Sequence, residues 1–297
     1  MKIRVLSDLH IDVNEDYPLK LENKDTFTII AGDTAGYMYT GIRWIQENVR
    51  QGIVISGNHI VYSPDARPIQ DLKKDWAHAF PPEAAVTYLD QMTGVMSKDV
   101  NNILFIGTTL YTDYALSTDV SPEYSMRLAC HPRRGMNDFR YGYTKGNDGN
   151  VRHIHPTDYQ RWFIESKKEI TRLVKSNPNK EIVLITHHCP SSKCGVYHEE
   201  LSASYASDLD DFIKDNPNIK LWVTGHIHQR KHFRIGNCLV LMNPRGYEAY
   251  GEGIGFNPNT FVDTKDWSVR QDPVKVCTKK QKDAFLNRLI KQLCYCG

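Results

Sequence analysis

The sequence has no apolar run that approaches the ~20 residues needed to cross a bilayer as a helix. This absence argues against a membrane-spanning protein. The amino-terminal run 1–6 passes directly into a predicted strand and does not have the layout of a secretory signal peptide. We therefore expect a cytoplasmic protein without a membrane partner.

The sequence also lacks an excess of charge of either sign. Its 37 Lys and Arg residues stand against 35 Asp and Glu residues, which gives a net charge of +2 at pH 7. Proteins that bind nucleic acid or anionic membranes through electrostatics usually carry a strongly basic region, and none is obvious here. Nucleic acid is therefore a disfavoured partner, and the composition predicts nothing about the oligomeric state.

The seven cysteines are odd in number and scattered along the chain, which does not suggest a disulfide framework. Cys294 and Cys296, near the end of the chain, lack the Cys-x-x-Cys spacing of common metal and redox motifs. Without a secretion signal, the expected state of these cysteines is the reduced thiol of a cytosolic protein.

Short β-branched runs that alternate with helical patterns dominate the first two thirds of the sequence. This order predicts an α/β domain with a mostly parallel sheet and flanking helices. Strands are predicted at 3–7, 26–31, 53–56, 102–110, 181–186 and 219–224, with short strands near 232–242, and helices at 40–50, around Leu72 and Trp76, at 156–176 and near 207–214.

The remaining segments divide the chain into one domain and a tail. Residues 112–155 are polar, aromatic and rich in Gly, with weak periodicity, and are predicted to form an irregular insertion on the substrate side. The domain is predicted to span residues 1–269. Residues 270–297 form a Lys-rich tail that is predicted to be helical.

Five predicted strands end in side chains of the kinds that bind metals. In two of them the side chains are two residues apart, and in an extended chain such residues point to the same side. An isolated His at a strand end is usually a turn or packing residue, but folding does not require polar residues at five such ends. The residues are Asp8 and His10, Asp33, Asn58 and His59, His187, and His226 and His228.

The chemistry of this set favours borderline first-row metals. Imidazole, carboxylate and amide oxygens are present, and no thiolate is. Seven donors are too many for one catalytic ion with an open position, but they suit two ions that share a carboxylate. Because Asp8 and Asp33 are the only anions, a site with two divalent cations would keep positive charge and attract phosphate.

The order of these residues resembles the calcineurin-like metallophosphoesterase superfamily over about residues 1–260. Three further segments, 107–113, 136–140 and 243–247, resemble a bacterial and phage branch of that superfamily. The resemblance implies a four-layer α/β/β/α sandwich of two mixed β-sheets flanked by helices. It also implies two divalent transition metal ions, with Mn as the first choice and Fe, Zn, Ni or Co as the alternatives.

The resemblance also implies which residues bind each ion. One ion would take Asp8, His10, Asp33 and His228, and the other would take Asp33, Asn58, His187 and His226, so that Asp33 bridges. A bridging hydroxide would attack phosphorus in line. His59 would be the catalytic residue, either as proton donor to the leaving oxygen or as a positive partner of the phosphoryl group; such acid catalysis contributes ~10²–10⁴-fold.

The sequence departs from the protein Ser/Thr phosphatases of this superfamily around His59. Those enzymes have an acidic residue where this chain has Gly36, and an acid often follows the Asn-His pair where this chain has Ile60. The acid that orients the histidine is thus missing from both usual places. The terminal Gly-His-x-His, which ends in His228, is typical of phosphodiesterase-like members.

Four residues near the predicted centre are candidates for substrate binding. Arg245 is a candidate for a bidentate phosphate clamp, with a salt-bridged structural arginine as the alternative. Asp138 and Arg140 are candidates for the rim of the substrate opening, with a surface turn as the alternative. His188 adjoins a predicted ligand, and because neighbours in an extended chain face opposite sides, it is expected mainly to support the site from behind.

Two groups of basic residues are given no role in the site. The small patch of His131, Arg133 and Arg134 is typical of a solvated face. The same holds for the tail lysines, Lys279, Lys280 and Lys282.

The predicted function is hydrolysis of a phosphodiester or of a small phosphorylated molecule, including nucleotides. The first alternative is a metal-dependent DNA or RNA nuclease, because one nuclease branch shares the same five motifs. The second alternative is a non-catalytic scaffold that keeps the fold. The complete set of predicted ligands argues against the scaffold, and the near-neutral charge argues against the nuclease.

Overall fold

The computed structural model describes residues 1–14, 19–62, 65–116, 119–195 and 199–272. Two six-stranded sheets lie face to face, and a two-stranded sheet lies apart from them. The predicted helical tail lies outside the described residues from position 273 onward, and its first residues belong to the last strand, β14 (Ser268–Gln271).

The first sheet contains the amino-terminal strands. Its first four strands in the chain are parallel neighbours, and its last two strands are added antiparallel at one side. In spatial order the strands are β14, β13 (Thr260–Asp263), β1 (Lys2–Leu6), β2 (Phe27–Ala31), β3 (Gly52–Ile55) and β4 (Val86–Tyr88).

The second sheet has four parallel strands at its centre and one antiparallel strand at each edge. In spatial order the strands are β11 (Lys231–Ile235), β12 (Cys238–Met242), β10 (Ile219–Thr224), β9 (Glu181–Thr186), β6 (Ile103–Thr108) and β5 (Ser97–Val100).

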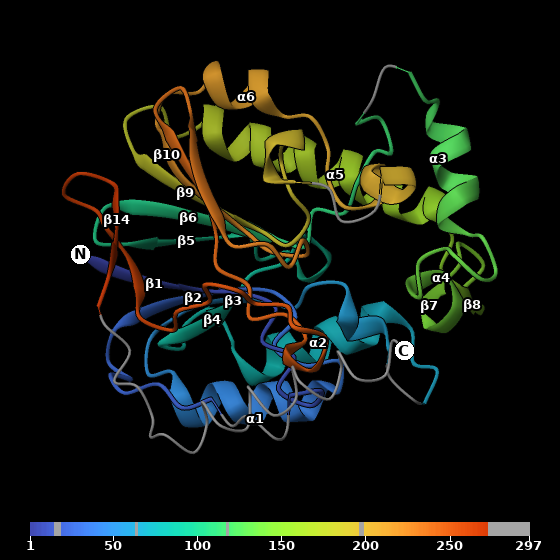
Figure 1. The fold of residues 1–297 in the computed structure, drawn as a ribbon, viewed down its shortest axis with the longest axis horizontal. Coiled ribbons are helices and arrows are strands. Elements are labelled where there is room, and N and C mark those ends of the chain that lie inside the picture. The colour runs from blue at the N-terminus through green and yellow to red at the C-terminus, as the bar shows by residue number, and fades with distance from the viewer. Residues whose placement is uncertain (15–18, 63–64, 117–118, 196–198, 273–297) are drawn as a thin grey trace, which may run out of the picture.

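Helices cover the outer faces of both sheets (Figure 1). Below the first sheet lie α1 (Met38–Asn48) and α2 (Ile69–Ala79), and above the second lie α5 (Pro156–Lys175) and α6 (Asp210–Lys214). The predicted four-layer α/β/β/α sandwich is therefore confirmed. Among the described helices, none combines the length and the apolar character that a membrane crossing requires.

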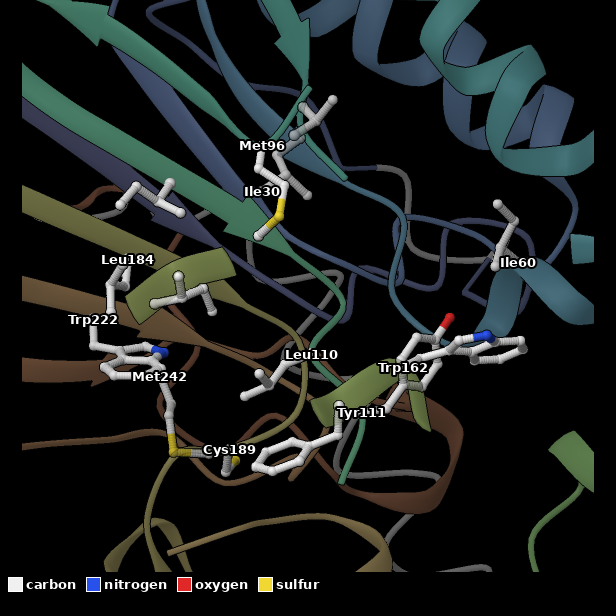
Figure 2. Close-up of a cluster of buried hydrophobic side chains, with 14 of the residues drawn as sticks. Ile30, Ile60, Met96, Leu110, Tyr111, Trp162, Leu184, Cys189, Trp222 and Met242 are labelled. Carbon is white, nitrogen blue, oxygen red and sulfur yellow. The ribbon is translucent and has the colours of Figure 1, made fainter. Parts of the chain in front are cut away.

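The strands read as continuous apolar runs because both of their faces are buried. In β9, Val183 and Ile185 pack between the two sheets, whereas Leu184 packs under the helices. Figure 2 shows the helix-side cluster, in which Leu184 and Trp222 belong to the second sheet. Burial on both faces is the pattern expected of parallel strands in α/β proteins.

Residues 112–155 are less irregular than the weak periodicity indicates. They contain α3 (Pro122–Ala129), α4 (Asp138–Tyr141) and the hairpin of β7 (Tyr143–Lys145) and β8 (Val151–His153), at the right of Figure 1. Elements this short hold too few residues to show a clear hydrophobic period. The 3-10 turns are η1 (His59–Val61), η2 (Gln91–Thr93), η3 (Ser192–Cys194), η4 (Glu199–Ser204) and η5 (Glu248–Tyr250).

Candidate metal centre

The predicted ligands meet where the carboxyl ends of the two sheets come together. They follow β1, β2 and β3 of the first sheet and β9 and β10 of the second. Three groups of His and Asp side chains have ligand atoms that all lie within 4.8 Å of one another, and they are Asp8, His10 and His228; His10, Asp33 and His59; and Asp33, His187 and His226. We call the first the β1 cluster and the last the β9 cluster.

Asp33 is a member of the β9 cluster and connects it to the β1 cluster. Its Oδ2 is 3.0 Å from His187 Nε2 in the β9 cluster, and it also groups with His10 of the β1 cluster. In the β1 cluster, His10 Nε2 lies 3.1 Å from His228 Nε2, and Asp8 Oδ1 lies 3.5 Å from that same nitrogen. Each cluster therefore brings several donor atoms close enough together to bind one ion.

The donor atoms of the centre fit a bound cation. Asp8 Oδ2, Asn58 Oδ1 and His226 Nε2 are buried and have no hydrogen-bond partner among the described residues. Buried polar atoms almost always have a partner, and each one without a partner costs free energy. A metal ion would satisfy these atoms, and the mixture of imidazole, carboxylate and amide oxygen suits borderline metals.

The backbone holds four of these residues in an unusual conformation. Asp8, His10, Asp33 and His226 have φ values of 49°, 42°, 51° and 67°. This left-handed region costs a non-Gly residue about 1–3 kcal/mol and persists only where the surroundings enforce it. Hydrogen bonds help to hold this conformation here. Asp8 N donates to the Gly32 carbonyl at 3.1 Å, and His226 N donates to Asp8 Oδ1 at 2.8 Å.

Two of the glycines that precede predicted ligands give other ligands their space. A Cβ on Gly57, just before Asn58, would overlap Asp33 Oδ1, and a Cβ on Gly225 would lie 2.5 Å from Asp8 Oδ2. Any larger residue would push these carboxylates away. The Gly-Asn-His and Gly-His-x-His motifs therefore contain glycine because the ligand side chains need close approach.

Side chains and carbonyls behind the centre fix the orientation of the ligands. Asp138 Oδ1 accepts a hydrogen bond from Asn58 Nδ2 at 2.8 Å, so the amide oxygen of Asn58 is left for the cavity. His187 Nδ1 lies 2.8 Å from the Ala31 carbonyl. Partners of this kind orient metal-binding imidazoles and carboxamides and strengthen metal binding.

Burial and charge set the pKa values of the histidines in opposite directions. Burial lowers the pKa of His187, but the Asp33 carboxylate outweighs it and raises the pKa to about 9. The pKa of His226 lies well below its ordinary value because of burial and the neighbouring His188 and His187. His226 is therefore neutral and keeps a lone pair with which it can bind a metal.

His59 lies at the edge of the centre. Its Nε2 is 3.3 Å from the Tyr247 hydroxyl and 3.7 Å from Asp33 Oδ2, and its side chain is 16% exposed. A Cβ on Gly36 would lie 3.3 Å from Asp12 Oδ2 and 3.9 Å from His59 Nδ1. The carboxylate of Asp12 thus occupies space beside Gly36, where the sequence lacks the usual acid.

A cavity of about 250 Å³ opens beside these residues. Its floor contains Asp33, Asn58, His226 and His228. The remaining lining residues are His59, Tyr62, Arg134, Gly135, Met136, Asn137, Asp138, Leu201, Tyr205 and Tyr247. Residues 134–138 belong to the predicted substrate-side insertion, so that segment does reach the cavity.

Three of the four predicted substrate residues do not line this cavity. Arg245 is buried, its Nε donates to Glu248 Oε1 at 2.7 Å, and it lines a different cavity with Ile11 and Asn14. Arg140 instead donates to Asn137 Oδ1 and to the carbonyl of His131. These contacts correct the expectation that both arginines face the substrate.

His188 is fully buried and packs against His226 and Tyr111, with ring centroids 4.3 Å and 5.5 Å away. Burial, together with His187, lowers its pKa to about 3. It supports the β9 cluster from behind and does not reach substrate. Asp138 does line the cavity, but its oxygens are engaged by Asn58, Tyr62 and Tyr159.

Several residues at the centre carry no recognisable signal in the sequence. Glu252 Oε2 lies 2.5 Å from His228 Nδ1, although it is 24 residues further along the chain. Tyr247 packs its ring on His10 at 4.4 Å, and the resemblance marks its segment without giving it a role. Tyr62 packs on His59 at 4.4 Å. The contacts of Glu252 and Tyr247 join segments far apart in the sequence and depend on loop geometry.

Comparison with known proteins agrees with this arrangement. The sequence model of calcineurin-like phosphoesterases matches residues 1–230, and no curated protein matches the chain. The solved structure of phosphopantetheinyl hydrolase (PptH) from Mycobacterium tuberculosis is 16% identical with a TM-score of 0.63, over 93% of this chain and 98% of that one. A dimetal phosphatase from Danio rerio is 8% identical with a TM-score of 0.46, over 88% and 91%.

At 16% identity the phosphopantetheinyl hydrolase structure supports a likeness of fold alone. The family follows from the sequence match, because it covers well over half of the 297 residues and includes every predicted metal ligand. The chain belongs to the calcineurin-like phosphoesterase family.

Proposed function

We propose that this protein is a phosphoesterase that uses two divalent metal ions, with Mn as the first choice and Fe, Zn, Ni or Co as the alternatives. The observation that carries the proposal is that Asp33 groups both with His187 and His226 of the β9 cluster and with His10 of the β1 cluster. When bound, the metals would supply positive charge for the phosphoryl oxygens and acidify the attacking water.

The chain's own residues supply the geometry for that chemistry. Asp8, His10 and His228 would hold one ion, and Asn58, His187 and His226 would hold the other, with Asp33 shared. Buried ligands fixed by a strained backbone need little reorganisation, which favours stabilisation of charge in the transition state.

His59 is proposed to act on the leaving group. Its ring lines the cavity and its Nε2 reaches the Tyr247 hydroxyl at 3.3 Å. From this position His59 can donate a proton to the leaving oxygen or stabilise the phosphoryl group with positive charge. The Tyr247 hydroxyl would hold the imidazole toward that oxygen.

The cavity favours a small substrate. A volume of about 250 Å³ is at or below the lower end for sites that enclose small molecules, and its walls include Tyr62, Tyr205 and Tyr247. Such a cavity suits a small phosphorylated molecule or a phosphodiester better than a nucleic-acid duplex.

The deciding experiment combines metal analysis with a substrate panel. The purified protein is loaded with each candidate metal and assayed on an aryl monoester, an aryl diester, a cyclic nucleotide and DNA. We expect metal-dependent turnover of the small esters, and loss of that turnover in Asn58→Ala and His226→Ala with the fold unchanged by circular dichroism.

Matched controls separate loss of the site from general effects of substitution. Asn147→Ala and His232→Ala remove exposed residues of the same kinds outside the centre and should keep full turnover. Unchanged turnover in either site variant would overturn the assignment. Preferred cleavage of DNA would instead support the nuclease function.

A further inference from the structure

Arg134 is the single lysine or arginine among the described residues that line the cavity. It belongs to the small basic patch that the sequence suggests is merely solvated. Its side chain is exposed, and it forms no ion pair within the described part of the chain. The guanidinium of Arg134 lies on the wall of the cavity beside the proposed phosphate site. It is therefore available to bind a second anion.

The turn that carries Arg134 is firmly held. His131 Nδ1 accepts hydrogen bonds from the backbone N–H groups of both Arg133 and Arg134 at 3.2 Å. Gly135 N donates to the His131 carbonyl and Met136 N to the Ala129 carbonyl, each at 2.8 Å. These bonds fix the backbone from which the arginine side chain extends.

The same turn is anchored to the metal centre. Asp138, four residues after Arg134, binds Asn58 Nδ2 at 2.8 Å and the Tyr159 hydroxyl at 2.7 Å. Arg140 Nη2 donates to the His131 carbonyl at 3.2 Å and so connects the segment of Asp138 to the turn that carries Arg134. The position of Arg134 relative to the proposed ligand Asn58 is therefore set by the fold.

We infer that Arg134 binds a second anionic group at the far end of the substrate, on the assumption that the proposed phosphoesterase site is correct. A guanidinium stays protonated at all relevant pH values and pairs with phosphate or carboxylate through two parallel hydrogen bonds. The substrate class is a phosphate ester whose organic part spans the cavity, past Tyr62 and Tyr205, and ends in another phosphate or a carboxylate.

Direct binding tests this inference without relying on turnover. Isothermal titration calorimetry is performed on the Mn-loaded full chain with phosphonates, whose P–C bond the proposed activity does not cleave. The probes are pentylphosphonate, 5-phosphonopentanoate, and the terminal bisphosphonates of alkanes from five to eight carbons. We expect one of the doubly anionic ligands to bind about tenfold more tightly than pentylphosphonate, the size of effect expected for one charge-assisted pair. The carboxylate arm distinguishes the two kinds of second anion.

The matched variants are Arg134→Ala and Arg133→Ala, which remove the same charge from adjacent positions. The advantage of the doubly anionic ligand should vanish in the first and persist in the second, and Arg134→Lys should restore part of it. Equal loss in both alanine variants, or no advantage in the wild type, would overturn the inference. Failure of the phosphoesterase proposal would appear separately, as absence of metal-dependent ester cleavage or of pentylphosphonate binding.

Discussion

The carboxylate of Asp138 holds the amide of Asn58, with Oδ1 and Nδ2 2.8 Å apart across 80 residues of sequence. Two tyrosine hydroxyls, from Tyr62 and Tyr159, complete the environment of that carboxylate. Asp138 lines the cavity, as expected, and it also fixes which atom of a proposed metal ligand faces the cavity.

Replacing Asp138 by Asn should weaken metal binding at the β9 cluster. The new amide cannot accept as strongly from Asn58, and loss of such supporting partners typically lowers metal affinity or activity by about 10–100-fold. Chelator competition followed by metal analysis measures the effect. Asp148→Asn, the same substitution at an exposed position of the insertion that does not line the cavity, is the control, and equal losses in both variants would contradict the proposed link.

Glu252 should support metal binding at the β1 cluster, as Asp138 does at the β9 cluster. Its Oε2 lies 2.5 Å from His228 Nδ1, and it also accepts from the backbone N–H of Tyr247 at 2.9 Å. We expect Glu252→Gln to reduce the affinity of that cluster for metal by about 10–100-fold, as measured by metal content after dialysis against a chelator. Glu248→Gln, whose carboxylate binds Arg245, should retain its metal.

Removing the imidazole of His59 should slow catalysis without removing metal. We expect His59→Ala to lower kcat by about 10²–10⁴-fold, the usual contribution of a general acid. The loss should be smallest for esters with acidic leaving groups such as nitrophenol, because these need little protonation. Metal analysis is performed on the same preparation, and loss of one ion would show that His59 is a ligand.

A fourth prediction concerns stability, far from the centre. At the start of α5, Asp158 accepts two hydrogen bonds from Arg152 and one from the backbone N–H of His155. Asp158→Asn should cost about 2 kcal/mol of unfolding free energy. Differential scanning calorimetry should show this as a fall in Tm of roughly 3 °C.

The Asp158 contribution should depend on pH. Burial raises the pKa of this carboxyl, but the bonds from Arg152 and His155 outweigh it and hold the pKa below its ordinary value. A carboxyl with a lowered folded pKa stabilises the protein fully above its unfolded pKa of about 3.9 and loses that contribution as the pH falls through the folded value. The Tm gap between wild type and Asp158→Asn should therefore be constant above about pH 5 and shrink below pH 4. A gap that widens in acid would contradict this.

The gathering of the proposed ligands at one site was predictable because each of them depends on a local pattern. A buried strand followed by a polar side chain is visible in sequence, and the parallel arrangement of strands brings such ends together. The structure places all seven predicted ligands at one site, with Asn58 Oδ1 and His226 Nε2 buried there without partners. Helix α5 was predicted for similar reasons, since its long amphipathic pattern is unambiguous.

The residues around the ligands were not predictable, because their positions depend on loops. Arg245 and Arg134 are both arginines in polar loop segments, and the sequence favours the first as a phosphate binder. In the structure the pairing with Glu248 turns Arg245 away, and the turn around His131 places Arg134 on the cavity wall. Which arginine faces the site is decided by three-dimensional neighbours that a single sequence does not reveal.

Strand β1, at the start of the chain, pairs with β13, which comes near the end of the described residues. In this pairing Ile3 lies opposite Val262. During synthesis the amino-terminal strand emerges long before its neighbour exists, so the middle of the finished sheet is at first an open edge. Open edges invite wrong pairing, and contacts this distant in sequence form slowly. The contact of Glu252 with His228 likewise forms only after residue 252 has been synthesised, so the proposed metal site should be complete only from that point on.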